Sequence, residues 1–180
     1  MPNSAPLPGS PSPGRAARGF GEAPVVNPVT VGAPPGSPAG SPRDLYRAAP
    51  LERVALIRHG IPAMAVKQLL AEVPMGQGAG LAALNLPVAT INKKVKLQAA
   101  LSPDETERVI GLARLLGQVQ TMLAESGEPA GFDAGAWLAR WLTEPLPSLG
   151  GARPADLLDT MEGQGLVSTA LAQLQSGAYA

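Results

Sequence analysis

One stretch of the chain contains the residue types that recognise bases and bind phosphates in nucleic acids. Its polar side chains are Thr90, Asn92, Lys93, Lys94 and Lys96. No acidic residue lies between Leu81 and Leu101. Asparagine can pair with adenine through two hydrogen bonds, threonine can contact a base edge, and lysine neutralises phosphates. These residues therefore suit the major groove of a DNA duplex.

The same lysines also fit a simpler interpretation, in which an ordinary amphipathic helix keeps them on a solvated face. The surrounding acid-free sequence and the turn that precedes the lysines favour DNA binding instead. The sequence leaves both interpretations open at this point.

A helix-turn-helix is the element that would present these side chains. We expect a short helix over residues 80–85, a tight turn at Leu86 and Pro87, and a second helix over residues 88–98. The residues expected to face inward are Leu81, Leu84, Val88, Ile91 and Val95. The polar residues of the second helix would then point outward or to its flanks.

Helices are also predicted upstream of this motif. Residues 43–58 indicate one or two helices that Asp44 can cap and that end at His59 and Gly60. His59 is the only histidine, and a helix-end interaction explains it better than catalysis. A further helix is expected over residues 63–73, opened by Pro62.

The glycines Gly76, Gly78 and Gly80 lack the preceding strand and the full spacing of a dinucleotide-binding loop. We therefore interpret them as a linker.

The longest predicted helix covers residues 101–123. Ser102 is its expected N-cap, Pro103 its first residue, and Glu105 the partner that completes a capping box. Its apolar residues are spaced by three and four and predict a single buried stripe. They are Val109, Leu112, Leu116, Val119 and Leu123.

Three more helices are predicted towards the C-terminus, the second of them a short helix that Pro154 opens and that runs through Leu158. Asp133 caps the first of them, which places Trp137 and Trp141 on one face, either as core or, in part, as a surface for a partner. The last helix is expected over residues 160–175. Its predicted inward residues are Leu166, Val167, Ala170, Leu171 and Leu174.

Composition limits the remaining possibilities. Among 180 residues, 3% are aromatic and none is cysteine, which favours a small all-α bundle and excludes disulfides and thiolate ligands. The net charge of zero excludes a generally polycationic coat. Residues 1–42 are rich in Pro, Gly and Ser, so we expect a disordered tail, and a proline-rich docking peptide is the alternative. No signal peptide or apolar span is evident, so a cytoplasmic protein is expected.

Enzymatic chemistry finds little support in the sequence. Asp156, Asp159 and Glu162 recur every three residues and could pair as acid and base or hold a cation, but their turn location favours capping or interface roles. No nucleophile, base and orienting group form a set. We expect no catalytic residue, no metal and no cofactor.

The C-terminal half resembles the Xre/MbcA/ParS class of antitoxins, which bind RES-domain toxins. The similar segments are LSPDETERVIGLARLL, WLTEPLPSLGGARPADLLDTMEGQGLV and the terminal LAQLQSGAYA. The resemblance covers residues 81–180 and is weaker over the helix-turn-helix. This sequence departs from the class at Lys93 and Lys94, where arginines are common. Because lysine lacks the planar fork of arginine, the departure affects bidentate recognition of guanine more than contact with phosphates.

The resemblance implies an antitoxin that neutralises a RES toxin acting on NAD and represses its own operon as a homodimer on operator DNA. Together with the composition and the predicted helices, the resemblance leads us to expect three parts: a tail (1–42), a DNA-binding unit (43–101) and a toxin-binding domain (102–180). The expected toxin-binding residues are Trp141 and the tip that enters the toxin's active site: Ser176, Gly177, Ala178, Tyr179 and Ala180. The alternative is a transcriptional regulator whose C-terminal part serves dimerisation or another partner.

Overall fold

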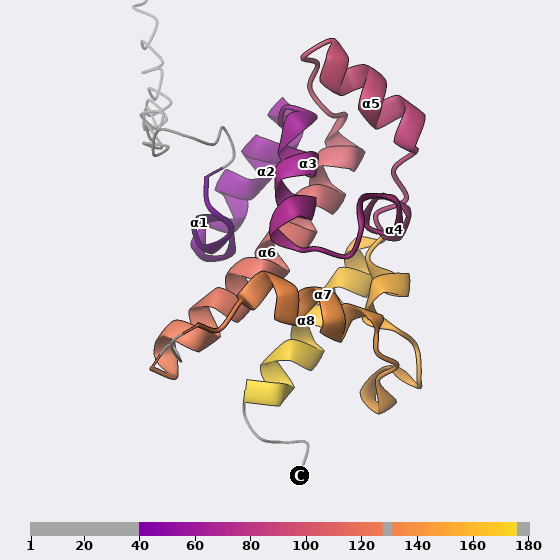
Figure 1. The fold of residues 1–180 in the computed structure, drawn as a ribbon. Helices are drawn as coiled ribbons and strands as arrows, with labels where there is room; N and C mark the ends of the chain where they lie inside the picture. The colour runs from indigo at the N-terminus through magenta and orange to yellow at the C-terminus, as the bar shows by residue number, and fades with distance from the viewer. Residues whose placement is uncertain (1–39, 128–130, 176–180) are drawn as a thin grey trace, which may run out of the picture. The chain divides into compact units, whose positions relative to one another are not determined.

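The computed structural model describes residues 40–127 and 131–175, and these residues are all-helical, as predicted (Figure 1). The elements in order are α1 (Pro42–Arg47), α2 (Pro50–His59), α3 (Met64–Glu72), α4 (Gln77–Ala83), α5 (Val88–Lys96), α6 (Pro103–Glu125), α7 (Ala134–Thr143), the 3-10 turns η1 (Pro147–Leu149) and η2 (Pro154–Leu157), and α8 (Met161–Gln175). Residues 1–39 of the predicted tail and the predicted tip, residues 176–180, lie outside the described residues.

Helices α1 and α2 confirm the helices expected over residues 43–58, with one correction at the start. Ser41, not Asp44, is the N-cap of α1, because its Oγ accepts the Asp44 backbone N–H at 3.2 Å. Asp44 completes the capping box by accepting the Ser41 N–H at 3.1 Å. At the other end, α2 stops at His59, and Gly60 follows with a φ of +81°, as predicted.

Helices α4 and α5 form the predicted helix-turn-helix pair, and α3 precedes them. The loops on either side of the unit are tied together by two backbone hydrogen bonds. The Ala63 N–H donates to the Ala99 carbonyl at 3.0 Å, and the Leu101 N–H donates to the Ile61 carbonyl at 2.8 Å. The segment that enters α3 is thereby fixed to the segment that leaves α5.

Two expectations about this unit were wrong. Gly78 and Gly80 lie inside α4 rather than in a linker, and a Cβ at Gly80 would collide with the Leu70 side chain of α3. The absence of a side chain at Gly80 therefore lets α4 pack closely against Leu70 of α3. Val88 is 49% exposed instead of buried. The core covers the middle of α5, where Ile91 is fully buried, and leaves the first residue of that helix in solvent.

Helix α6 is the central element of the described fold. Its capping box is confirmed, since the Glu105 N–H donates to Ser102 Oγ at 3.3 Å and the Ser102 N–H donates to Glu105 Oε2 at 2.7 Å. The single buried stripe was too narrow a prediction, because Ile110, Leu115 and Gln118 on other sides of α6 are also buried. The reason is that α1, α2, α7 and α8 all pack against this helix.

Helix α8 runs alongside α6 in the same direction. The Gln118 side chain donates to the Ser168 carbonyl at 2.9 Å, and Ser168 Oγ donates to Gln118 Oε1 at 2.7 Å. Further along, Gln175 Nε2 donates to the Glu125 carboxylate at 3.1 Å. These polar contacts fix the register between the two helices.

The inward face of α8 was only partly predicted. Val167, Ala170 and Leu171 are buried, but Leu166 is 48% exposed and Leu174 is 36% exposed. Leu166 lies on the flank of the face that packs on α6, and Leu174 lies in the last turn, where α6 also ends. An apolar residue in a helix indicates a buried position only where a neighbouring element covers it.

Candidate functional site

Helix α5 presents a cationic, solvent-exposed face. Lys93 and Lys96 are exposed, as is Thr90, and Asn92 is half-buried at the edge of this face. A shallow hollow of about 320 Å³ lies on the outer side of the helix. It is lined by Asn92, Lys93 and Lys96, together with Ala89 and Leu97. The structure therefore brings together Asn92, Lys93 and Lys96 of the five residues that the sequence indicated for DNA contact, and Thr90 is exposed outside this hollow.

Lys94 stands apart from that face. Its ammonium group forms an ion pair with the Glu105 carboxylate of α6, and the two side chains are 25% and 13% exposed. Burial raises the pKa of the Glu105 carboxyl, but hydrogen bonds from Lys94 and the Ser102 backbone outweigh that effect and hold the pKa below its usual value. Residue type and spacing do not indicate that Lys94, among the three lysines, has an acidic partner.

Three of the aromatic side chains form a row on and before α7. The Trp137 and Trp141 rings are stacked with centroids 6.0 Å apart, and the Phe132 ring lies 6.4 Å from Trp137. Trp141, the predicted contact residue, is only 7% exposed, whereas Phe132 is 41% exposed and Trp137 is half-buried. Sequence reasoning missed Phe132, although its place just before the Asp133 cap sets it near the next helix's aromatic residues.

The outer face of α8 carries little charge. Glu162 is the one charged residue in the helix, and Met161, Leu166 and Leu174 are exposed apolar side chains. Such a surface is typical of an interface core, where charged residues are depleted. The helix ends at Gln175, directly before the predicted tip.

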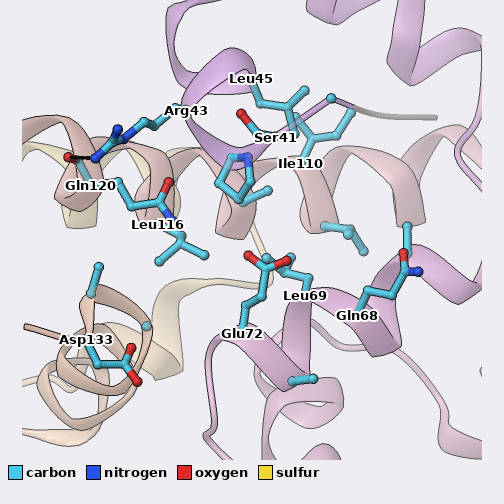
Figure 2. Close-up of a pocket in the computed structure, with 18 of the residues that line it drawn as sticks. Ser41, Arg43, Leu45, Gln68, Leu69, Glu72, Ile110, Leu116, Gln120 and Asp133 are labelled. Carbon is cyan, nitrogen blue, oxygen red and sulfur yellow. Dashed lines mark hydrogen bonds between the residues drawn. The ribbon is translucent and has the colours of Figure 1, made fainter. Parts of the chain in front are cut away.

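A groove that the sequence did not predict opens between α1, α3, α6 and the start of α7. Its volume is about 1220 Å³. Figure 2 shows Glu72 and Asp133 on its lower side and Arg43, which donates to the Gln120 carbonyl at 2.9 Å, on its upper side. Burial raises the pKa of the Glu72 carboxyl. The walls combine apolar side chains such as Leu69 with polar groups such as Gln68 and Glu72.

In the described part of the chain, no three His, Asp or Glu residues lie close enough together to hold a metal ion. Asp156 and Asp159 are exposed in the turn before α8, and Thr160 Oγ1, rather than either carboxylate, accepts the Gly163 N–H at 3.1 Å. In residues 40–127 and 131–175, no helix has the length and apolar character to span a bilayer.

Family comparisons match two regions of the chain. Residues 52–114 match the antitoxin Xre-like helix-turn-helix domain, which spans α2 to the first half of α6. Residues 130–177 match the antitoxin Xre/MbcA/ParS C-terminal toxin-binding domain, which includes α7 and α8. The cationic face of α5 lies in the first match, and the aromatic row and the outer face of α8 lie in the second.

Two relatives extend these matches. The chain is 51% identical over 145 residues to the "Prs ADP-ribosylating antitoxin" of a Sphingobium species, an alignment that covers 81% of this chain and 91% of that protein. It is 24% identical over 92 residues to "Antitoxin Xre" of Pseudomonas putida, which covers 51% of this chain and 52% of that protein.

Proposed function

Because the chain belongs to the Xre/MbcA/ParS antitoxins of toxin–antitoxin systems, we propose that it neutralises a RES-domain toxin that acts on NAD, and that it represses its own operon. The observation that carries the toxin half is the match of residues 130–177 to a toxin-binding domain. In this proposal the protein has no catalytic activity of its own and works in the cytoplasm, where it meets both the toxin and the operator.

The toxin contact has two parts in this proposal. Phe132 and Trp137 supply accessible aromatic area, and the charge-poor α8 supplies the exposed apolar side chains Leu166 and Leu174. Aromatic side chains are enriched among the residues that dominate binding energy. The tip, residues 176–180, follows α8 directly and would cover the toxin's active site, because a short end attached to a fixed helix loses little entropy on binding.

The toxin's reaction is proposed from the relative's name. The name "Prs ADP-ribosylating antitoxin" links that relative to the transfer of ADP-ribose to Prs. We infer that the cognate toxin of this chain transfers ADP-ribose from NAD to a Prs protein rather than only hydrolysing NAD. The antitoxin would block this transfer by occupying the cleft that receives NAD.

Co-purification with the product of the neighbouring toxin gene tests the toxin half. We expect a stable complex in which NAD consumption by the toxin is abolished. Labelled NAD incubated with free toxin and a Prs protein is expected to label that protein. A toxin that remains fully active in excess antitoxin would contradict the proposal.

The DNA half rests on the α5 face within the helix-turn-helix match. Thr90 and Asn92 would contact base edges, and Lys93 and Lys96 would contact phosphates. We propose a homodimer, since operator symmetry normally mirrors protein symmetry. Binding of the purified toxin–antitoxin complex to its own promoter fragment, compared with a scrambled fragment of equal length, tests this half.

A further inference from the structure

Helix α5 is attached to the rest of the fold by few apolar contacts. Within the described residues, Ile91 is its one buried side chain, and Val95 is half-buried against the core. Both lie on the inner side of a helix of nine residues. Backbone hydrogen bonds fix the segment that follows α5, but a single buried side chain does not fix how this short helix is rotated, so its orientation depends on any further contact that it makes.

The ion pair of Lys94 with Glu105 is that further contact. Successive residues of an α-helix are rotated by about 100°, so Lys93 lies about 160° around the helix from Ile91, and Lys94 lies only about 60° from it. Lys94 therefore points along the flank that faces α6. Its partner is the less exposed of the two side chains, at 13%.

Glu105 is itself held in place by the cap of α6. The same oxygen, Oε2, accepts the Ser102 backbone N–H at 2.7 Å and the Lys94 ammonium group. Movement of this carboxylate towards solvent would break the capping box of the central helix. One oxygen thus joins α5 to the element on which the rest of the fold packs.

We propose that Lys94 and Glu105 form a clamp that orients α5 on α6, so that Lys94 is a positioning residue while Lys93 and Lys96 contact DNA phosphates. This inference rests on the proposed DNA binding. It divides three neighbouring lysines into two roles, which residue type and spacing alone do not distinguish.

Glu105→Gln separates the clamp from simple charge effects. Glutamine at this position of a capping box can still accept the Ser102 N–H, so the start of α6 is retained. Charge alone predicts that losing a carboxylate near DNA strengthens binding. The clamp predicts the opposite, a weakening of promoter binding of about fivefold, the size expected for loss of one ion pair. Asp104→Asn removes a neighbouring exposed charge and should not weaken binding.

The salt dependence of promoter binding distinguishes the proposed role of Lys93 from that of Lys94. We expect Lys93→Met to lower the slope of log K against log salt by about 0.9, the value for one phosphate contact. Lys94→Met should weaken binding about fivefold while leaving the slope unchanged. A slope that falls equally in both variants would overturn the division of roles.

Hydrogen exchange of the α5 amides, measured without DNA, tests the clamp separately from DNA binding. We expect protection to fall about fivefold in Glu105→Gln and Lys94→Met, and to stay at the wild-type level in Asp104→Asn and Lys93→Met. Unchanged protection in the first two variants would overturn the clamp. If the wild-type complex bound no promoter DNA, the proposed repression would fall, and the exchange result would still decide the clamp.

Discussion

Trp137 and Trp141 carry the same side chain, but the structure gives them different surroundings. Trp141 is 7% exposed and packs into the core, while Trp137 covers it and stays half-buried beside the exposed Phe132. Replacing the inner ring should therefore affect folding, and replacing the outer ring should affect binding. This difference makes the pair a matched test of the toxin-binding surface.

Trp137→Ala is expected to weaken the toxin complex by about 2 kcal/mol, roughly thirtyfold in Kd, as for an interface hot spot. Trp141→Ala is expected instead to lower the free energy of unfolding by about 3 kcal/mol, because it leaves a cavity. Titration calorimetry with the toxin and urea unfolding of the free antitoxin measure the two effects. Equal toxin affinity for wild type and Trp137→Ala would remove this ring from the interface.

Residue roles were predictable from the sequence only where a role depends on residue type. Asparagine, threonine and lysines in one helix indicated a nucleic-acid face, and the structure places three of the five around one hollow. Lys94 could not be separated from Lys93, because its partner Glu105 lies in the next helix and the pairing depends on the angle between them. Tertiary geometry, rather than local pattern, sets that angle.

At the scale of elements, glycines control how closely the helices approach α6. A Cβ at Gly117 would collide with the backbone carbonyl of Pro42 in α1. A backbone carbonyl cannot rotate away as a side chain can, so α1 would have to move. Gly165 of α8, by contrast, has nothing within 4 Å of its Cβ position.

Gly117→Ala is therefore expected to lower the free energy of unfolding by about 2 kcal/mol through overpacking. Gly165→Ala makes the same change in another helix and should raise it by about 0.5 kcal/mol, since alanine favours helix. Thermal or urea unfolding of the two variants measures the difference. If both changes stabilised the protein, the close contact of α1 with α6 would be disproved.

Glu105 also makes the stability of α6 depend on pH. Its folded-state pKa lies below the ordinary value of 4.5, so the unfolded state binds the proton more readily. The stabilisation is fully present above pH 4.5 and is lost as the pH falls through the lower, folded-state pKa. Urea unfolding at about pH 7 and about pH 3 should show wild type losing more stability on acidification than Glu105→Gln. A difference in unfolding free energy between wild type and Glu105→Gln that stays constant with pH would argue against the ion pair.

Helix starts were predictable because their signals are local. Ser102, Pro103 and Glu105 marked the first turn of α6, and Asp133 marked that of α7. Which sides of a helix are buried was less predictable, because burial depends on how many neighbours surround it. Gln118 lies outside the predicted apolar stripe, yet it is buried against Ser168 because α8 packs on that side of α6.

At the scale of the whole molecule, the two family matches share α6 as their support. The helix-turn-helix match ends within α6, and α7 and α8 of the toxin-binding match pack against the same helix. Proposed DNA contacts and proposed toxin contacts thus depend on one central element. The fold class and the family could be predicted from sequence patterns, whereas the groove beside Glu72 could not, since its walls come from four separate segments.

Neutralisation by the C-terminal segment is the proposal with the largest consequence for function. Deleting residues 176–180 removes no residue of α8, which ends at Gln175, so the fold and the docking surface of α7 and α8 should remain. A variant with these five residues replaced by a Gly-Ser sequence of equal length controls for chain length. Both variants should still bind the toxin, with reduced affinity.

The decisive measurement is the rate of NAD consumption by the toxin at saturating concentrations of the wild-type antitoxin, the five-residue deletion and the Gly-Ser replacement. We predict full inhibition by wild type and restored NAD consumption in the complexes of both variants, because the toxin is bound but its active site is open. Complete inhibition by the deletion variant would contradict active-site covering by the C-terminal segment.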